Sequence, residues 1–367
     1  MNAVTLPISS PVARVLVVDD SAVVRGLISR QLASDPGIEV VCTAANGQIA
    51  LDELRRRTID VVVLDIEMPV MDGLAALGHI VADFPHVRVV MASTLTRRNA
   101  EISLRALQIG ASDYVAKPET GLAAAEDFKR ELIHKIKALS QRRPSAPAGQ
   151  PVLQTHAHLL QAAPPPRTRP HSGIAVRPQV MAIGASTGGP PALLKLFESL
   201  RGAVEQPILL TQHMPPTFTA LLAEQLARAG DRPCAEGRDG EQIQPGRCYV
   251  APGGFHMVVA QEGTAKVIRL NQEAPENFCR PAVDPMLRSV AAAYGAASVA
   301  VILTGMGADG ARGCEVLAAA GGRFIAQDEA TSVVWGMPGA AAATGMAESI
   351  LPLDQIGPWV RRTTGAA

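Results

Sequence analysis

A serine between glycines follows a short apolar run near the middle of the chain. The run Val180–Ile183 has the composition of a buried strand, Ser186 lies in the segment Gly184–Gly188, and a helical pattern begins at Pro190. A sharp turn between strand and helix exposes a serine hydroxyl, and the N–H groups that begin the helix can hold an oxyanion beside it. The same turn could instead cradle a phosphate, although it matches neither a Walker A loop nor G-x-G-x-x-G.

A histidine and an aspartate follow two other predicted strands in this half of the chain. His213 comes after Pro207–Thr211, and Asp309 comes after Ser298–Leu303. Because the carboxyl ends of parallel strands open into one crevice, we expect both side chains to meet Ser186 there. In such a set the serine attacks a carbonyl, the imidazole takes its proton, and the carboxylate orients the imidazole. The chain order Ser, His, Asp differs from that of the α/β-hydrolases and of both protease groups.

Carboxylates, a serine and a lysine follow the predicted strands of the first half. They are Asp19 and Asp20 after the first strand, Asp65 after the third, Ser93 after the fourth and Lys117 after the fifth. Three carboxylates that close repel one another unless a divalent cation lies among them, and Mg²⁺ suits an oxygen-rich site. Asp65 could then accept a phosphoryl group as a nucleophile, while Lys117 pairs with the added charge and Ser93 binds a phosphoryl oxygen.

Strand and helix patterns alternate five times in the first half. The predicted strands are Arg14–Val18, Ile38–Cys42, Asp60–Leu64, Arg88–Ala92 and Ser112–Ala116. A helical pattern follows each of them, and the last, Glu126–Leu139, is charged and amphipathic. Alternation of this kind predicts an α/β fold with a doubly wound parallel sheet.

A second α/β unit begins at Gln179 and repeats the alternation. Between Cys234 and Asn271 short strand patterns separated by turns predict hairpins. His256, the alternative to His213 as a base, begins one of these hairpin strands and is less well placed. The sequence therefore predicts two doubly wound domains, at 14–140 and 179–362.

A proline-rich segment separates the two predicted domains. Residues 141–178 hold eight prolines among Arg, Ala, Gln and His, which predicts an extended, partly stiff linker. Its histidines His156, His158 and His171 could bind a metal, but a solvated linker is the simpler interpretation. Leu153–Ala163 could form a short helix.

Bulk composition excludes several classes of partner. The formal net charge is zero and aromatic residues make up only 3%, so nothing indicates nucleic-acid binding or a charged membrane surface. The apolar stretch Ser289–Ala308 is interrupted by glycines, and the N-terminus has no signal-peptide pattern, so we expect a cytoplasmic protein that does not insert into membranes. The five cysteines contain no C-x-x-C pair, which fits a reducing compartment.

The first half resembles the response-regulator receiver domain of two-component signalling. The resemblance spans about 14–139 and rests on the segments Val17–Ser21, Asp65–Gly73, Val90–Ser93 and Asp113–Pro118. It implies that a sensor histidine kinase phosphorylates Asp65. It also implies that Asp20, Asp65 and the backbone carbonyl of Glu67 hold Mg²⁺, with Asp19 helping through water. Finally, it implies that Tyr114 is an aromatic switch coupled to Ser93, and that the Lys117–Pro118 bond is cis.

The second half resembles the catalytic domain of the CheB family of chemotaxis protein-glutamate methylesterases. The resemblance spans Gln179 to about Pro358 and rests on the segments Gly184–Gly189, Gln212–Pro215, Arg280–Asp284, Thr304–Gly310 and Gly336–Gly339. It implies a flavodoxin-like receiver followed by a Rossmann-like methylesterase domain that needs no cofactor of its own. The implied roles are nucleophile for Ser186, base for His213, orienting carboxylate for Asp309, oxyanion donor for the Met306 N–H and support of His213 for Thr187.

The resemblance implies hydrolysis of γ-glutamyl methyl esters on methyl-accepting chemoreceptors, and deamidation of receptor glutamines. It further implies that the unphosphorylated receiver covers the Ser186 crevice and that phosphorylation loosens this contact. Two alternatives remain at this point. One is an adaptor that binds receptors without catalysis. The other is a nucleotide-binding domain, which lacks the expected acidic residue because the next strand ends in Gln212 and His213.

Overall fold

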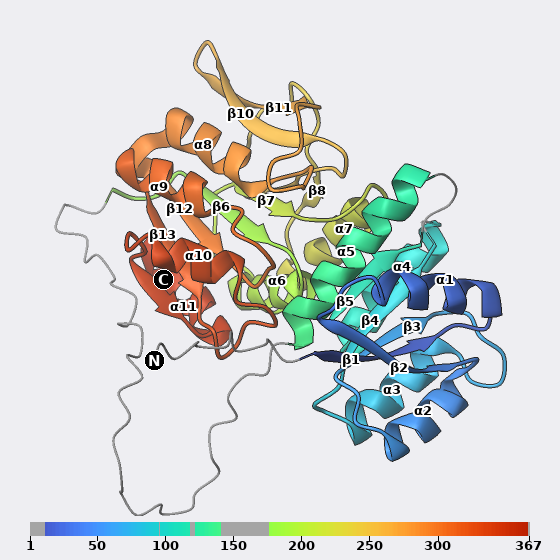
Figure 1. The fold of residues 1–367 in the computed structure, drawn as a ribbon. Helices are drawn as coiled ribbons and strands as arrows, with labels where there is room; N and C mark the ends of the chain where they lie inside the picture. Colours follow the sequence, from blue (N-terminus) through green and yellow to red (C-terminus); the bar gives the residue numbers. More distant parts are fainter. Residues whose placement is uncertain (1–11, 95, 118–121, 141–175, 366–367) are drawn as a thin grey trace, which may run out of the picture.

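The computed structural model describes residues 12–94, 96–117, 122–140 and 176–365, which form two α/β domains (Figure 1). Several predictions fall outside these residues. They are the cis bond to Pro118, the short helix at 153–163, the three linker histidines and most of the linker at 141–178.

Five parallel strands form the sheet of the first domain, in the order β2-β1-β3-β4-β5. The strands are β1 (Ala13–Val18), β2 (Ile38–Ala44), β3 (Val61–Asp65), β4 (Arg88–Ser93) and β5 (Asp113–Ala116). Helices α1 (Ala22–Leu32) and α5 (Leu122–Ser140) cover one face, and α2 (Gly47–Arg56), α3 (Gly73–Asp83) and α4 (Arg97–Ile109) cover the other. The predicted doubly wound sheet is confirmed.

Four helices of this domain begin at residues whose side chains cap them. Ser21, Asn46, Asp72 and Thr96 each accept a hydrogen bond from the backbone N–H three positions further on. An N-cap of this kind stabilises a helix by about 1 kcal/mol. Each cap therefore fixes the residue at which its helix begins.

Seven parallel strands form the sheet of the second domain, in the order β14-β13-β12-β6-β7-β9-β8. The strands are β6 (Val180–Ala185), β7 (Ile208–Gln212), β8 (Cys234–Glu236), β9 (Cys248–Val250), β12 (Ser298–Ile302), β13 (Arg323–Gln327) and β14 (Ser349–Leu351). Helices α6 (Gly189–Leu200), α7 (Phe218–Gly230) and α11 (Leu353–Thr364) pack on one face. Helices α8 (Val283–Tyr294), α9 (Ala311–Ala319) and α10 (Met337–Ala343) pack on the other.

The prediction of hairpins throughout 234–271 is wrong in its first part. Strands β8 and β9 pair parallel with each other, and β9 pairs parallel with β7, so both extend the main sheet. Only β10 (His256–Glu262) and β11 (Ala265–Asn271) form an antiparallel hairpin. The three residues of β9 are completely buried. That burial is typical of a strand inside a parallel sheet covered on both faces, where no alternating pattern marks the strand.

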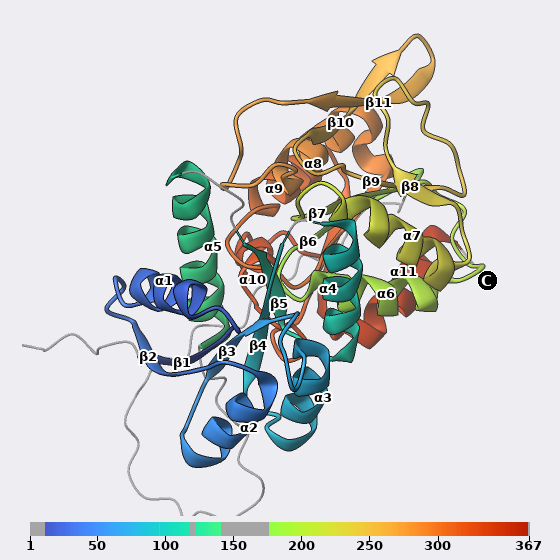
Figure 2. The ribbon, with the colours of Figure 1, turned by 90° about the vertical axis from the view of Figure 1, so that its right-hand side faces the viewer.

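The two domains pack directly against each other. Figure 2 shows α4 beside α6 and α7, and these helices are in contact. Across this interface the Tyr114 ring stacks on the Phe218 ring, with centroids 4.4 Å apart and planes within 5°. The Gln108 amide donates to Gln225 at 3.2 Å, and Arg97 lies 3.6 Å from Glu224. A single buried apolar cluster runs from the first domain into the second.

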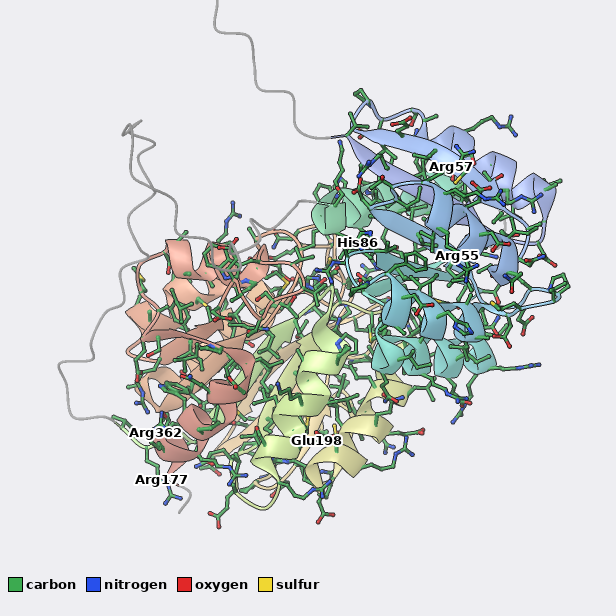
Figure 3. All side chains as sticks on the ribbon, turned by 90° about the horizontal axis from the view of Figure 1, so that it is seen from below. Arg55, Arg57, His86, Arg177, Glu198 and Arg362 are labelled. Carbon is green, nitrogen blue, oxygen red and sulfur yellow. The ribbon has the colours of Figure 1, made fainter. Side chains whose placement is uncertain are left out.

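Charged side chains lie on the outside of both domains. Among the side chains labelled in Figure 3, Arg55 and Arg57 of the first domain are exposed, as are Glu198 and Arg362 of the second. Among the described helices, none is long and apolar enough to cross a membrane.

All five cysteines are free thiols.

Candidate active site

Ser186 lies on the turn that joins β6 to α6. Its N–H donates to the Thr304 carbonyl at 3.0 Å, which ties the turn to the end of β12. Gly188 has a φ of 75°, and a Cβ there would lie 2.5 Å from Val333. At Gly189 a Cβ would lie 2.0 Å from the Gln212 side chain. The glycines are therefore required by both backbone conformation and close packing.

The serine hydroxyl and two nearby N–H groups are without hydrogen-bond partners in the part of the chain that the structure describes. They are Ser186 Oγ, the N–H of Thr187 and the N–H of Met306. Ser186 itself is partly exposed to solvent. An available hydroxyl next to available N–H donors is the arrangement that acyl transfer uses to hold an oxyanion.

His213 and Asp309 form a hydrogen-bonded pair, as the sequence predicts. His213 follows β7, and its Nε2 lies 2.7 Å from Asp309 Oδ2. Burial lowers the pKa of His213, but Cys279 and Asp309 outweigh burial and raise it to about 10. Burial raises the pKa of Asp309, but hydrogen bonds from His213 and two backbone N–H groups outweigh burial and lower it below its ordinary value. Asp309 is therefore an ionised carboxylate that stabilises the imidazolium.

Ser186 and His213 lie at neighbouring strand ends. Strands β6 and β7 pair in register up to Ala185 and Gln212, and the His213 N–H donates to the Ala185 carbonyl at 3.1 Å. The Gln212 side chain donates to the Ser186 carbonyl at 3.0 Å. Within the described ranges the structure contains no hydrogen bond between Ser186 Oγ and the imidazole. Such bonds often form only when substrate is bound.

His256 has a structural role, so the alternative base is not part of this site. Its side chain is 1% exposed. The Ala282 N–H donates to Nδ1 at 3.2 Å, and Nε2 lies 3.2 Å from the Ala274 carbonyl. Both ring nitrogens are therefore occupied by the backbone, and the imidazole holds the chain between β11 and α8 in place.

Three residues around the His213–Asp309 pair were not singled out in the sequence analysis. Asn277 donates to Asp309 Oδ1 at 3.0 Å, and the N–H of Asp284 donates to the same oxygen at 3.0 Å. Cys279 is one of the groups that raise the pKa of His213. Asp284 belongs to a segment that the family resemblance covers, but Asn277 and Cys279 lie in an irregular segment with no periodic signal.

Thr187 contacts the first domain. Thr187 is 2% exposed. Its hydroxyl donates to Asp113 Oδ2 at 2.6 Å. Asp113 lies at the start of β5, and its Oδ1 lies 3.3 Å from the Lys135 ammonium group. The predicted support of His213 by Thr187 is therefore not made through this hydroxyl in the docked arrangement. A side chain of one domain instead holds the residue next to Ser186 in the other.

The acidic pocket of the first domain forms as predicted. Carboxylate oxygens of Asp19, Asp20 and Asp65 all lie within 4.8 Å of one another. Lys117 Nζ lies 2.6 Å from Asp19 and 2.7 Å from Asp65. Burial raises the pKa of Asp65 above its ordinary value, although Lys117 opposes this rise. Burial lowers the pKa of Lys117, but Asp19 and Asp65 outweigh burial and raise it.

The other three residues predicted for the receiver pocket, Ser93, Glu67 and Tyr114, differ in burial and in the groups that they contact. Ser93 is buried at the end of β4, and its hydroxyl accepts a hydrogen bond from Ser103. The Glu67 side chain is exposed and lies 3.9 Å from Arg98, so only its backbone could serve the pocket. Tyr114 is 4% exposed and stacks on Phe218 instead of reaching Ser93 by a hydrogen bond.

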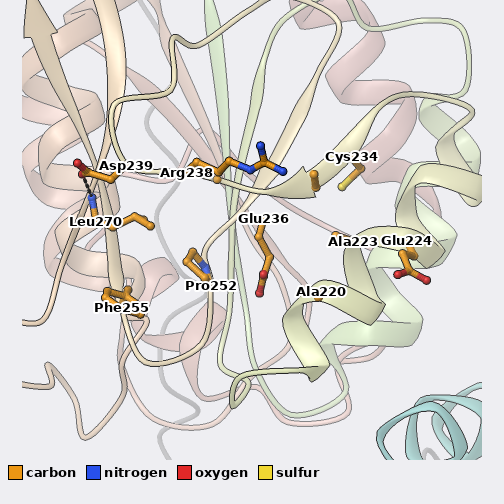
Figure 4. Close-up of a pocket in the computed structure, with 12 residues that line it drawn as sticks. Ala220, Ala223, Glu224, Cys234, Glu236, Arg238, Asp239, Pro252, Phe255 and Leu270 are labelled. Carbon is orange, nitrogen blue, oxygen red and sulfur yellow. Dashed lines mark hydrogen bonds between the residues drawn. The ribbon is translucent and has the colours of Figure 1, made fainter. Parts of the chain in front are cut away.

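A cavity of about 520 Å³ lies elsewhere on the second domain (Figure 4). Helix α7, strand β8 and the end of β11 line it, and Glu236, Arg238 and Phe255 are among its residues. None of Ser186, His213 and Asp309 lines this cavity. This cavity is therefore separate from the site around Ser186.

The two domains together define a class of protein, a response regulator whose output domain is an α/β enzyme. Residues 15–125 match the family model of the response regulator receiver domain, and residues 181–360 match that of the CheB methylesterase. With relatives that are about half identical over nearly the whole chain, the chain belongs to the CheB family.

Relatives about half identical to this chain match it over nearly their full length. A protein-glutamate methylesterase/protein-glutamine glutaminase of Paramagnetospirillum magneticum is 52% identical over 363 residues, which cover 95% of each chain. The relative of the same name from Azospirillum brasilense is 52% identical and covers 96% of this chain and 93% of its own. The solved catalytic domain of the Thermotoga maritima CheB methylesterase is 38% identical, with a TM-score of 0.49, over 51% of this chain and 99% of its own.

Proposed function

We propose that this chain removes methyl groups from the glutamyl side chains of methyl-accepting chemoreceptors, deamidates receptor glutamines, and is controlled by its own receiver domain. The observation that carries the proposal is the His213–Asp309 pair at 2.7 Å, next to the turn that presents Ser186. The names of the relatives support the choice of substrate.

The proposed reaction passes through an acyl-enzyme. Ser186 Oγ attacks the ester carbonyl carbon while His213 takes the hydroxyl proton. With Nε2 facing Asp309, Nδ1 is the ring nitrogen that remains for this proton. The N–H groups of Thr187 and Met306 hold the negative oxygen of the tetrahedral intermediate. When the bond to the methoxy group breaks, His213 returns the proton and methanol leaves.

Water completes the cycle. It gives a proton to His213 and attacks the acyl carbon, which releases the glutamate carboxylate and restores the Ser186 hydroxyl. A glutamine side chain follows the same steps with ammonia in place of methanol. Asp309 remains ionised throughout, since the groups that its oxygens contact among the described residues are hydrogen-bond donors.

The receiver pocket fits a divalent cation. Three carboxylates with oxygens within 4.8 Å of one another are a hard-ligand set that suits Mg²⁺. Asp20, Asp65 and the Glu67 carbonyl would hold the ion, and Asp19 would contribute through water. A bound Mg²⁺ would stabilise negative charge on the phosphoryl group that a histidine kinase delivers to Asp65. Lys117 would pair with this charge, and Ser93 would bind a phosphoryl oxygen.

Contacts between the two domains support the proposed control by the receiver. In the docked arrangement Asp113 accepts a hydrogen bond from Thr187, the residue next to the proposed nucleophile. Burial lowers the pKa of Lys135, but Asp113 and Glu131 outweigh burial and raise it, so Lys135 stays charged and holds Asp113 in place. The Tyr114–Phe218 stack lies beside this contact. Phosphorylation of Asp65 would favour a second receiver state in which these contacts weaken.

The experiment that tests the function uses methylated receptor fragments and the full chain. We expect methanol to be released and glutamyl methyl esters to be converted to glutamate. Mass spectrometry of the fragments measures this conversion. A small acyl-phosphate donor should increase the rate, and equal rates with and without the donor would contradict receiver control. Binding of the fragment with no chemical change would favour an adaptor instead of an enzyme.

Replacing Asp113 with alanine is expected to raise the unphosphorylated rate of methanol release by about tenfold. A hydrogen bond to a charged group contributes about 1.5–3 kcal/mol, and losing it shifts the docked population by that factor or more. The rate without any phosphodonor is the measurement. Asp83→Ala, which removes an exposed carboxylate at the end of α3, is the control and should leave this rate unchanged. An unchanged rate for Asp113→Ala would show that this contact does not restrain the enzyme.

A further inference from the structure

The segment Glu276–Cys279 forms a tight turn in an unusual backbone conformation. Its two middle residues, Asn277 and Phe278, have φ values of 51° and 63°. The N–H of Glu276 and the N–H of Cys279 donate to each other's carbonyls at 3.2 and 2.9 Å. Two consecutive positive φ values between such bonds define a type I′ turn, which Asn tolerates and Phe does not favour. Tertiary contacts must therefore hold this turn in place.

The first residue of the turn is attached to α8. Arg288 on α8 binds both carboxylate oxygens of Glu276, at 2.9 and 2.5 Å. The same helix begins with Val283, whose N–H donates to Asp309 at 2.6 Å. Helix α8 thus connects the turn to the carboxylate that faces His213.

The second residue of the turn lies between two buried carboxylates. Asn277 Nδ2 donates to Asp309 Oδ1 at 3.0 Å and to Asp284 Oδ2 at 3.2 Å. Asp284 and Asp309 are each 1% exposed. Both partners are acceptors, so the amide nitrogen must face them, and its two hydrogens are divided between them. A neutral donor here offsets the repulsion between two negative groups.

We infer that Asn277 is a positioning residue for ester hydrolysis, which holds Asp309 in the orientation that presents Oδ2 to His213 while keeping Asp284 from competing with it. The inference rests on the proposed function. Cys279, from the same turn, is among the groups that raise the pKa of His213. Asn277 does not touch the reacting atoms, and acts only through Asp309.

Three variants of the full chain test this role, with acyl-phosphate present and methylated receptor fragments as substrate. Asn277→Gly keeps a backbone that adopts positive φ and removes the amide, and Asn277→Asp keeps the shape and replaces the donor with an acceptor. We expect kcat to fall about tenfold in Asn277→Gly, and at least as far in Asn277→Asp, with KM within about twofold of the unmodified chain. The far-downfield proton resonance of the His213–Asp309 hydrogen bond should shift in both variants.

Phe278→Gly is the matched control, since it changes the backbone freedom of the same turn without removing a contact to Asp309. Its imidazole proton resonance should stay where it is. A kcat within twofold in both Asn277 variants with an unshifted resonance would overturn the inference, and so would an equal loss of kcat and an equal shift in Phe278→Gly. Ser186→Ala, measured in the same experiment, distinguishes failure of this inference from failure of the proposed function. Activity retained in Ser186→Ala would overturn the proposed function itself.

Discussion

Replacing Ser186 with alanine is expected to lower methanol release from methylated receptor fragments by about 10⁴- to 10⁶-fold. The hydroxyl is the atom that would form the acyl-enzyme, and only oxyanion binding and substrate positioning remain without it. Ser186 Oγ has no hydrogen-bond partner among the described residues, so its removal leaves no buried group unsatisfied. The free energy of unfolding should change by no more than about 0.5 kcal/mol.

A control for this experiment is Ser199→Ala on α6. Its hydroxyl donates only to the Leu196 carbonyl of its own helix, so the rate should stay within about twofold of the unmodified chain. Both variants should still bind the receptor fragment. A Ser186→Ala chain that releases methanol at a tenth of the normal rate or faster would rule out the serine mechanism.

The acidic pocket of the receiver was predictable from the sequence because each of its members follows a strand. A parallel sheet brings all its carboxyl ends to one edge, so the strand assignments alone predicted that Asp19 and Asp65 meet there. The structure pairs their strands, β1 and β3, directly. Lys117 then had to reach the same edge from β5, and it contacts both carboxylates. The same rule brought His213 and Asp309 together.

What sequence reasoning missed lies outside that rule. Asn277 and Cys279 come from a turn between a hairpin and a helix, where neither a period of two nor one of 3.6 marks a buried residue. Strands β8 and β14 are three residues long, too short for a pattern to appear. The hydrogen bond between Thr187 and Asp113 joins the two domains. The strand and helix patterns of each domain do not specify which surface of one domain packs on the other.

Replacing Asp309 with asparagine is expected to lower kcat by about 10⁴-fold, as the wrong imidazole tautomer does in other serine hydrolases. The reason follows from the donors that surround this carboxylate. Oδ1 accepts from Asn277 and from the N–H groups of Asp284 and Gly310. An asparagine nitrogen at that position would face three donors, so the amide is expected to turn the other way.

In the other orientation the nitrogen replaces Oδ2, where it meets one backbone donor, the Val283 N–H, and donates to His213 Nε2. The imidazole must then carry its proton on Nδ1, and no ring nitrogen remains to accept the serine proton. The variant also loses the anion that raises the pKa of His213, which is about 10 in the docked chain.

A base acts only when it is neutral, so kcat/KM of the unmodified chain should rise as the pH increases towards the pKa of His213. In Asp309→Asn the midpoint of this rise should move to lower pH, while the plateau falls. Profiles of kcat/KM from neutral to alkaline pH test both effects, with thermal unfolding measured at each pH as a check on folding. Asp328→Asn, at a turn beyond β13 where the carboxylate accepts hydrogen bonds from Thr331, is the control and should leave the midpoint in place. A loss of less than tenfold, or a midpoint that does not move in Asp309→Asn, would mean that the carboxylate neither sets the tautomer nor stabilises the imidazolium.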